Sequence, residues 1–481
     1  MASFYVLALL VVGVLLAIPV VLWNVAKGLL LQLGLFCLVG AFVILKAILP
    51  RADHFEPPGP LLTPDKQPDL FAEICDLAVR TGQDEPAEVY LIADANAWVN
   101  QRGGFMGLGG RRVMGIGLPL LQALTIAELR GVLAHEFGHF HHGDVAVGPW
   151  IHKTRAALVR TVVELKSHSE ALSRVFIWYG NHFFRVSHAV SRHQELLADR
   201  LAAGIVGVDV FASGLRGSNS AGLAFARYWN DSVSLVLSFG FSPPLASGFE
   251  AFMKTPTVAT DLAEALKHQA LHEKPQPYDT HPPLADRLVA LGASRSSLPR
   301  VQGTPAVSLL HDLGALETAL AKTLVKGAAK GPAKGPVAWE EVGEKVWLPL
   351  WQAQARRLDG VLAGITPGSL PNTAWEWIGR RLLGRGAGEA REAADFAVGI
   401  GLAVVLARAG LRVESLPGRR HATVGRGERI EIFDVRTRLA EGQQAVEAWR
   451  NQCIRLGIAD ADLGAACASE PTVAERLALT R

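Results

Sequence analysis

The sequence predicts a mainly helical α+β protein, with an N-terminal pair of apolar helices, a central helical domain holding a small antiparallel sheet, and a C-terminal α+β region. Three observations predict this class. Two uncharged apolar runs lie at residues 3–23 and 28–45. Apolar residues recur at helical spacing on both sides of the stretch VLAHEFGHFHHGD, and short strand patterns bounded by glycine occur within 86–121 and 411–435.

Length and composition limit the number of domains, the classes of partner and the role of the cysteines. A chain of 481 residues has room for two or three domains, and its formal net charge of +3 is small for that size. No basic stretch alternates with aromatic residues, so nucleic acid is not an expected partner. The four cysteines, Cys37, Cys75, Cys453 and Cys467, form no C-x-x-C pair. They indicate neither a disulfide framework nor a zinc ribbon, and they fit a reducing compartment.

Residues 1–50 are predicted to form a transmembrane helical hairpin. Each apolar run is about long enough to cross a bilayer, and the connection NVAKG is too short for a domain. A cleaved signal peptide is the rival interpretation of the first run. The run lacks a basic leader and a small-residue cleavage site followed by polar sequence, so we reject that interpretation. A proline-rich linker over 51–65 then leads to a domain predicted over 66–300.

The domain over 66–300 begins with strand patterns and then becomes helical. Alternation over 89–92 and a strand over 111–116, separated by a glycine-rich turn, predict the small antiparallel sheet. Thr125 followed by Glu128 forms a capping box, which predicts that a helix begins there. Apolar residues continue at helical spacing to Phe140, and Gly143 is placed to end the helix.

This helix carries His135 and His139 four residues apart, and therefore on one face. Two imidazoles at that separation can reach one zinc ion. Glu136 can point at a water molecule held in an open coordination position of that ion. The alternative is a core helix with a buried polar face, whose histidines have other partners. A third ligand from elsewhere in the chain is needed to decide between a metal site and a buried polar face.

The candidate third ligand lies in SRHQELLADR, residues 191–200, on another helical run. Glu195 and Asp199 are one turn apart on one face, in the pattern of a zinc-binding carboxylate followed by a carboxylate behind the ligands. We expect Asp199 to accept a hydrogen bond from His135, which would fix the tautomer of that ligand. The alternative is a solvated helix face paired with Arg192 and Arg200.

Three stretches, HEFGHFHHGD, ELLAD and THPPLADRL, together resemble the HtpX and CAAX-prenyl-protease family of membrane zinc metallopeptidases, over about residues 60–295. The resemblance implies a gluzincin-type site with one Zn²⁺ per chain, bound by His135, His139 and Glu195. It implies that Glu136 is the general base, taking a proton from the attacking water. Asp144 also matches a family position, although a helix-ending role is an equal interpretation.

Further candidates extend this site. His281, in a segment that turns at two prolines and then becomes helical, is the candidate donor to the oxyanion, and Arg287 is the second choice. A surface histidine before a proline turn is the alternative for His281. The stretch Asn96, Ala97 and Trp98 resembles the family's edge segment, which would bind an extended substrate through main-chain hydrogen bonds. The alternative is an ordinary meander without function.

Beyond residue 300 the sequence carries no catalytic constellation. Residues 301–337 are predicted as a linker region, because LVKGAAKGPAKGP over 324–336 is rich in Gly, Pro and Lys. Residues 338–481 are predicted as an α+β domain of unknown role. Within it, the apolar run over 396–410 is short and ends in charge, so we predict a buried helix and no membrane span.

The leading hypothesis is an integral-membrane zinc endopeptidase acting on membrane-associated or misfolded proteins. A membrane sensor protease that cuts one regulator is the second hypothesis, and a non-enzymatic membrane scaffold the third. Lys46 and Arg51 follow the second apolar run, whereas the loop between the runs carries only Lys27. This charge bias predicts a catalytic domain on the cytoplasmic side. A bacterial inner membrane is the first choice of location, because the composition is rich in Ala and Gly and low in Lys relative to Arg, and a eukaryotic endomembrane is the alternative.

Overall fold

A computed structural model of the 481-residue chain describes residues 2–26, 31–49, 55–102, 110–140, 148–272, 282–293, 301–328, 331–383 and 387–464. The chain divides into two compact units, which are described separately. The first consists of Met1–Leu223 and Glu264–Leu313, and the second of Ala224–Ala263 and Gly314–Arg481. Helices dominate both units, and the two units together contain three small sheets. The predicted mainly helical α+β class is confirmed.

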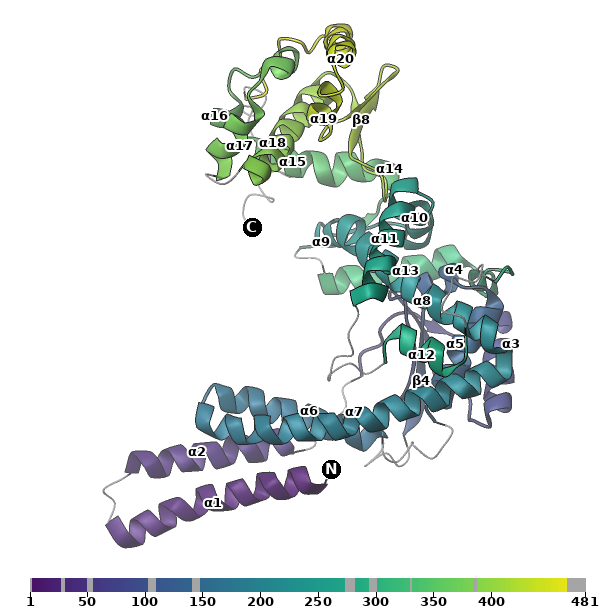
Figure 1. The fold of residues 1–481 in the computed structure, drawn as a ribbon, viewed down its shortest axis with the longest axis vertical. Helices are drawn as coiled ribbons and strands as arrows, with labels where there is room; N and C mark the ends of the chain where they lie inside the picture. Colours follow the sequence, from purple (N-terminus) through teal and green to yellow (C-terminus); the bar gives the residue numbers. More distant parts are fainter. Residues whose placement is uncertain are drawn as a thin grey trace. The chain divides into compact units, whose positions relative to one another are not determined.

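The first unit begins with two apolar helices, α1 (Ala2–Ala26) and α2 (Leu31–Ile48). They pack against α6 (Gly148–Lys166) and α7 (Glu170–Val206), and Figure 1 shows α6 and α7 running next to α2. Ala2–Val21 is long and apolar enough to cross a membrane, whereas Gln32–Ile48 is a shorter apolar helix. The buried side chains shared by these four helices are Phe4, Ala8, Val12, Leu15, Cys37, Ala41, Val43, Ile44, Ala157, Leu158, Leu165 and Phe176.

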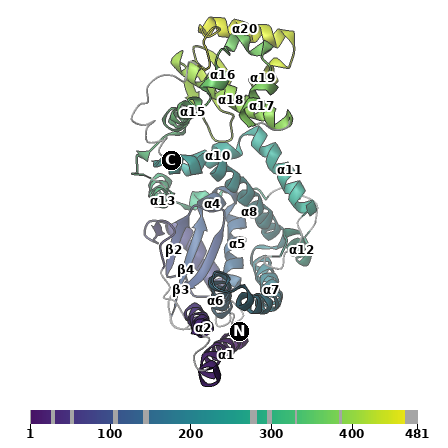
Figure 2. The same cartoon turned by 90° about the vertical axis from the view of Figure 1, so that its left-hand side faces the viewer.

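A four-stranded sheet follows, with the order β1-β2-β4-β3. The strands are β1 (Leu61–Leu62), β2 (Glu88–Ile92), β3 (Ala97–Arg102) and β4 (Arg111–Gly117). Figure 2 shows β2, β4 and β3 side by side next to α5 (Ile126–Gly138). The sheet is mixed and not purely antiparallel as predicted, because β2 and β4 are parallel. β4 lies between β2 and β3 and pairs antiparallel with β3, so β3 runs opposite to β2.

Helix α5 begins where the sequence predicts. Thr125 is its N-cap, and the Thr125 and Glu128 side chains form the reciprocal capping box. The Glu128 carboxylate is fully buried and also accepts a hydrogen bond from Ser213 Oγ at 2.6 Å. The helix ends earlier than predicted, at Gly138 with His139 as the C-cap residue, and Gly143 lies outside the described residues.

Ser169 divides the long helical run that precedes Glu195. Its side chain accepts from the amide of Leu172, so α7 starts anew after α6 ends at Lys166. The remaining elements of the first unit are α3 (Pro68–Thr81), α4 (Leu118–Ala123), α12 (Leu284–Ala290) and the 3₁₀ helix η2 (Ala306–Leu309). Two helices are divided between the units, α8 (Val208–Tyr228) and α11 (Pro256–His272).

The second unit is built around α18 (Ala387–Arg408), the apolar run predicted to be a buried helix. Its residues Ala394 to Leu406 contribute many of the side chains of a large core, which confirms that prediction. A three-stranded antiparallel sheet, β7-β8-β9, lies beside it, as the glycine-bounded pattern indicates. Its strands are β7 (Arg412–Glu414), β8 (Ala422–Gly425) and β9 (Glu428–Glu431).

The segment predicted as a linker contains regular structure. Helix α13 occupies Leu313–Ala328, and β6 (Gly335–Pro336) pairs in parallel with β5 (Phe241–Ser242). Leu320 and Val325 of α13 are buried, and most residues of this helix are Leu, Ala, Lys or Glu, which favour a helix. The other elements of the unit are η1 (Trp229–Val233), α9 (Ser234–Ser238), α10 (Leu245–Met253), α14 (Trp339–Val342), η3 (Gly343–Trp347), α15 (Leu348–Ala355), α16 (Asp359–Leu362), η4 (Pro367–Asn372), α17 (Trp375–Leu383), α19 (Val435–Leu439) and α20 (Gln443–Leu456).

Candidate metal centre

Helices α5 and α7 approach each other closely at Gly138. A Cβ added to Gly138 would lie 2.9 Å from the Cα of Ala198, so no larger residue fits without moving one helix. This contact lies one residue before His139 and three residues after Glu195. The close approach therefore brings the His135 and His139 face of α5 against the Glu195 face of α7.

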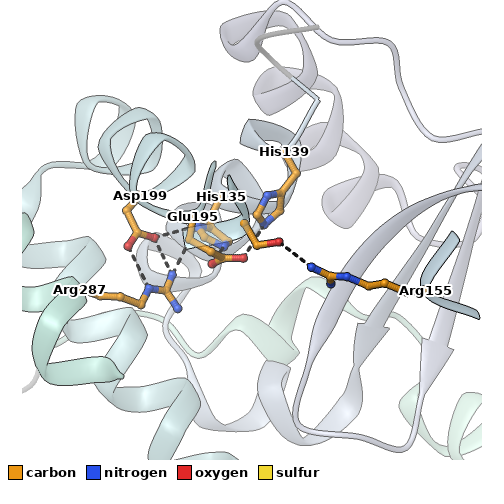
Figure 3. A network of polar contacts seen from close by, with 7 residues as sticks. His135, His139, Arg155, Glu195, Asp199 and Arg287 are labelled. Carbon is orange, nitrogen blue, oxygen red and sulfur yellow. Dashed lines mark hydrogen bonds and ion pairs between the residues drawn. The ribbon is translucent and has the colours of Figure 1, made fainter. Parts of the chain in front are cut away.

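The three predicted ligands converge at this crossing (Figure 3). His135, His139 and Glu195 each present one ligand atom, and these atoms lie within 4.8 Å of one another. The Nε2 of His135 is 3.4 Å from Glu195 Oε2, and the Nε2 of His139 is 3.6 Å from Glu195 Oε1. Both imidazoles therefore direct the same ring nitrogen at one carboxylate. Among the residues that the structure describes, this is the one such group of metal-binding side chains.

A second layer of polar groups lies behind His135. Its Nδ1 is 2.9 Å from Asp199 Oδ1, as the helical spacing of Glu195 and Asp199 predicts. Arg287 of α12 holds the same carboxylate from the other side, donating from Nε to Asp199 Oδ2 at 2.9 Å and from Nη2 to Oδ1. Glu195 and Asp199 are 5% and 1% exposed, which excludes the solvated helix face paired with Arg192 and Arg200.

The electrostatics of the cluster favour a cation. Burial by itself would lower the pKa of His135, but the Asp199 and Glu195 carboxylates outweigh it and raise that pKa to about 9. Burial opposes ionisation of Asp199 as well, yet hydrogen bonds from Arg287 and His135 lower its pKa. The carboxylate field that stabilises an imidazolium at this place also stabilises a bound metal ion.

The donor set fits zinc. Two imidazole nitrogens and one carboxylate oxygen are the protein ligands of a catalytic zinc site that keeps a further position open. The Asp199 contact to Nδ1 of His135 leaves Nε2 as the ligand atom. Phe211 of α8 stacks on the His135 ring, with ring centroids 6.1 Å apart, and so limits its rotation.

The other predicted residues are placed as follows. Glu136 is partly exposed on α5, directly after His135. Asn96 precedes β3, and Ala97 and Trp98 begin it, at the edge of the four-stranded sheet. Ala97 is buried, and the Trp98 ring lies over Gly115 of β4, where an added Cβ would be 2.4 Å from it. His281 and Asp144 lie outside the described residues.

The sequence did not indicate Arg155, which the structure places beside the cluster. Arg155 lies on α6, and its Nη2 donates to Ser187 Oγ at 3.0 Å and to Ser191 Oγ at 3.3 Å, both on α7. Ser191 is one turn before Glu195 on the same helix. No spacing rule links residue 155 to 187 and 191, so only the pairing of α6 with α7 reveals this contact.

A cavity of about 940 Å³ lies elsewhere, in the second unit. It is formed by residues 242–244 and by residues between 317 and 338. None of the predicted site residues lines it, so this cavity is not part of the metal centre.

Comparisons with known proteins cover the part of the chain that holds this candidate site. The family model described as Peptidase family M48 matches residues 64–295. Protease HtpX homolog 1 of Saccharolobus solfataricus is 58% identical over 41 residues, which cover 8% of this chain and 13% of that protein. Protease HtpX homolog 1 of Sulfurisphaera tokodaii is 54% identical over 39 residues, covering 8% of this chain and 12% of that protein.

No solved structure matches the chain. The matched region contains all the described residues of the candidate metal centre, from His135 on α5 to Arg287 on α12. The two relatives support the same assignment over a short part of the chain. The chain therefore carries a domain of peptidase family M48, a family of metallopeptidases, over residues 64–295.

Proposed function

We propose that this protein is an integral-membrane zinc-dependent endopeptidase that hydrolyses peptide bonds of membrane-associated or misfolded proteins. The observation that carries the proposal is the convergence of His135, His139 and Glu195 within 4.8 Å, with a partly exposed glutamate next in sequence to the first histidine. A non-enzymatic scaffold does not require three metal-binding side chains to converge on one point.

In this proposal His135, His139 and Glu195 hold one zinc ion per chain. Zinc, when bound, supplies Lewis acidity toward the peptide carbonyl and lowers the pKa of a water molecule toward neutrality. Glu136 is the general base: its carboxylate takes the proton of the attacking water and passes it to the leaving amine. Asp199 orients His135, and Arg287 orients Asp199.

Because Arg287 is engaged with Asp199, we assign it to positioning and keep His281 as the donor to the oxyanion. His281→Ala should then lower kcat by about 100- to 1,000-fold, with zinc content unchanged. An unchanged kcat would return His281 to the surface role that its sequence context also allows.

The substrate is proposed to bind as an extended chain along β3. This strand is the last in the sheet order, and it has β4 on one side. An edge strand offers main-chain groups to an added strand, and such pairing is independent of side-chain sequence. Asn96, Ala97 and Trp98 would contribute through their backbone, since the Ala97 and Trp98 side chains pack into the sheet.

The membrane part of the proposal rests on α1 and α2. Ala2–Val21 has the length and composition of a span, and several large apolar side chains of α1 are exposed, among them Leu10 at 63% and Trp23 at 70%. Phe42 of α2 is 66% exposed. Exposed apolar side chains on two adjacent helices are expected where lipid covers them. We propose a bacterial inner membrane, with the catalytic domain in the cytoplasm.

The test uses the full-length protein reconstituted in liposomes, with an unfolded soluble protein and a membrane-anchored reporter as substrates. Both should be cleaved, and removal of zinc by a chelator should abolish cleavage until zinc is restored. Glu136→Gln should abolish cleavage while zinc remains near one per chain. Glu170→Gln, the same change at an exposed position of α7, is the matched control and should remain active. Cleavage by Glu136→Gln or by the zinc-free protein would overturn the proposal.

A further inference from the structure

Two arginines flank the metal cluster on opposite sides (Figure 3). Arg287 reaches it from α12, at the Asp199 end of the ligand pair. Arg155 reaches it from α6, at the other end, through Ser187 and Ser191. The two side chains therefore bracket Glu195 along α7.

The two arginines differ in how their charge is compensated. Arg287 makes two hydrogen bonds to the buried carboxylate of Asp199. Arg155 donates to two neutral hydroxyls, and in the described part of the chain it has no carboxylate partner. Its Nε is buried without an acceptor in that same part. Burial lowers the pKa of Arg155, and among the described residues no ion pair offsets this shift.

A guanidinium in this state has unused capacity for an anion. Its planar array of donors matches a carboxylate, and such charge-assisted pairs are about twice as strong as neutral hydrogen bonds. Ser187 and Ser191 hold the side chain from one helix face, which lowers the entropy that a ligand must remove.

The position of the Arg155 guanidinium relative to Glu195 indicates where along the peptide substrate this anion lies. Ser191 and Glu195 are one helical turn apart, a rise of about 6 Å. An extended peptide advances about 3.3 Å per residue, so this offset corresponds to about two residues of substrate. We propose that Arg155 binds a carboxylate of the peptide substrate within a few residues of the scissile bond. This inference rests on the proposed peptidase function.

A substrate carboxylate has two sources, an acidic side chain and the C-terminal carboxylate of the chain. Matched peptides separate them. One series carries Glu or Gln at each of three positions on either side of the cleaved bond. The other ends in a free carboxylate or an amide at the same distances. We expect one position, in one series, at which the carboxylate raises kcat/KM by about 10- to 100-fold.

Variants of Arg155 test whether this residue causes the preference for a substrate carboxylate. Arg155→Gln should abolish it, and Arg155→Lys should retain part of it, because the charge stays while the paired donors are lost. Arg160→Gln is the matched control: Arg160 lies on the same helix and donates to the carbonyl of Ala47, and its loss should leave the preference unchanged. Zinc content and the unfolding temperature of each variant show that the comparison is made on folded, metal-loaded protein.

A binding measurement separates this inference from the proposed function. The same peptide pairs are titrated onto the Glu136→Gln protein by fluorescence anisotropy, which requires no cleavage. A carboxylate preference that is lost in the Glu136→Gln, Arg155→Gln double variant supports the inference even if the turnover scheme is wrong. Equal binding and equal kcat/KM for every pair, or a preference that survives Arg155→Gln, would overturn it while leaving the peptidase proposal intact.

Discussion

Asp199 Oδ1 lies 2.9 Å from Nδ1 of His135, and the same carboxylate is clamped by Arg287. This relationship decides which nitrogen of His135 is available to a metal, because the ring can direct Nε2 at the cluster only while Nδ1 faces Asp199. The orientation of one ligand thus depends on a contact between α7 and α12.

Asp199→Asn keeps the shape of the side chain and removes its charge. We expect zinc affinity to fall by roughly 10- to 100-fold, since the imidazole loses the acceptor that raises its basicity. Competition with a chelator of known affinity measures the change. Asp209→Asn, at an acidic position in the first turn of α8, is the control and should bind zinc like the parent protein. An unaltered affinity in Asp199→Asn would show that the contact has no influence on the metal.

Glu195→Gln tests the ligand that comes from the second helix. An amide oxygen is a weaker zinc ligand than a carboxylate, so we expect zinc content well below one per chain after dialysis, together with loss of cleavage. Elemental analysis of the purified protein gives the answer. Full occupancy and normal cleavage would mean that the third ligand lies elsewhere.

Gly138→Ala tests the helix crossing. The added Cβ would lie 2.9 Å from the Cα of Ala198, so the helices must separate, at a cost of about 1–3 kcal/mol in stability. Zinc affinity should fall as well, because the two helices carry different ligands. Gly204→Ala is the matched control on α7, with nothing within 4 Å of the new Cβ, and should be neutral or about 0.5–1 kcal/mol more stable. Equal behaviour of the two variants would contradict the prediction.

The pH dependence of the second unit should reveal His421. Its ring lies 4.4 Å from Trp347 and 5.3 Å from Trp351 between centroids, and burial lowers its pKa to about 4. The unfolded chain takes up this proton near pH 6.5, whereas the folded chain resists it until about pH 4. The contribution to stability is therefore complete above pH 6.5 and is lost as the pH falls toward 4, by up to about 3 kcal/mol.

Urea unfolding followed by tryptophan fluorescence at pH 7 and pH 4.5 measures this effect. His421→Phe keeps an aromatic ring without a titrating group, so its stability should fall less between the two pH values than that of the parent. Identical losses in both proteins would show that other groups account for the acid sensitivity.

Orientation is tested with reporters fused after Arg481. We expect activity from a reporter that works only in the cytoplasm and none from one that works only after export, because Lys46 and Arg51 follow the second apolar run. Activity of the exported reporter alone would reverse the assignment of the catalytic domain.

The sequence predicted a structural feature correctly where all the residues that determine it lie in one short segment. Thr125 and Glu128 predict the start of α5 because both partners of the capping box lie within four residues. The fixed period of the helix likewise predicts that His135 and His139 share a face. The end of α5 was predicted too late, because the helix stops at Gly138 and not at the next glycine in the sequence.

Features that depend on distant residues were not predictable from one sequence. The parallel pairing of β2 with β4 arises because β4 inserts between strands that are neighbours in the chain. The contact of Arg155 with Ser187 and Ser191 requires α6 and α7 to lie side by side. Helix α13 lies within the predicted linker region, but most of it precedes the Gly-, Pro- and Lys-rich stretch 324–336 and consists of Leu, Ala, Lys and Glu, which favour a helix.

Helix α7 also connects the N-terminal helices to the candidate metal centre as one continuous element. It is continuous from Glu170 to Val206, so Phe176, which packs with the apolar N-terminal helices, and Glu195 belong to one stiff rod. Their separation is roughly 28 Å at 1.5 Å per residue, and a tilt of one degree about Phe176 displaces Glu195 by about 0.5 Å. Active-site geometry tolerates shifts of only about that size. Because α7 is unbroken between these two residues, the packing of the N-terminal helices against it and the position of the candidate ligand Glu195 are geometrically coupled.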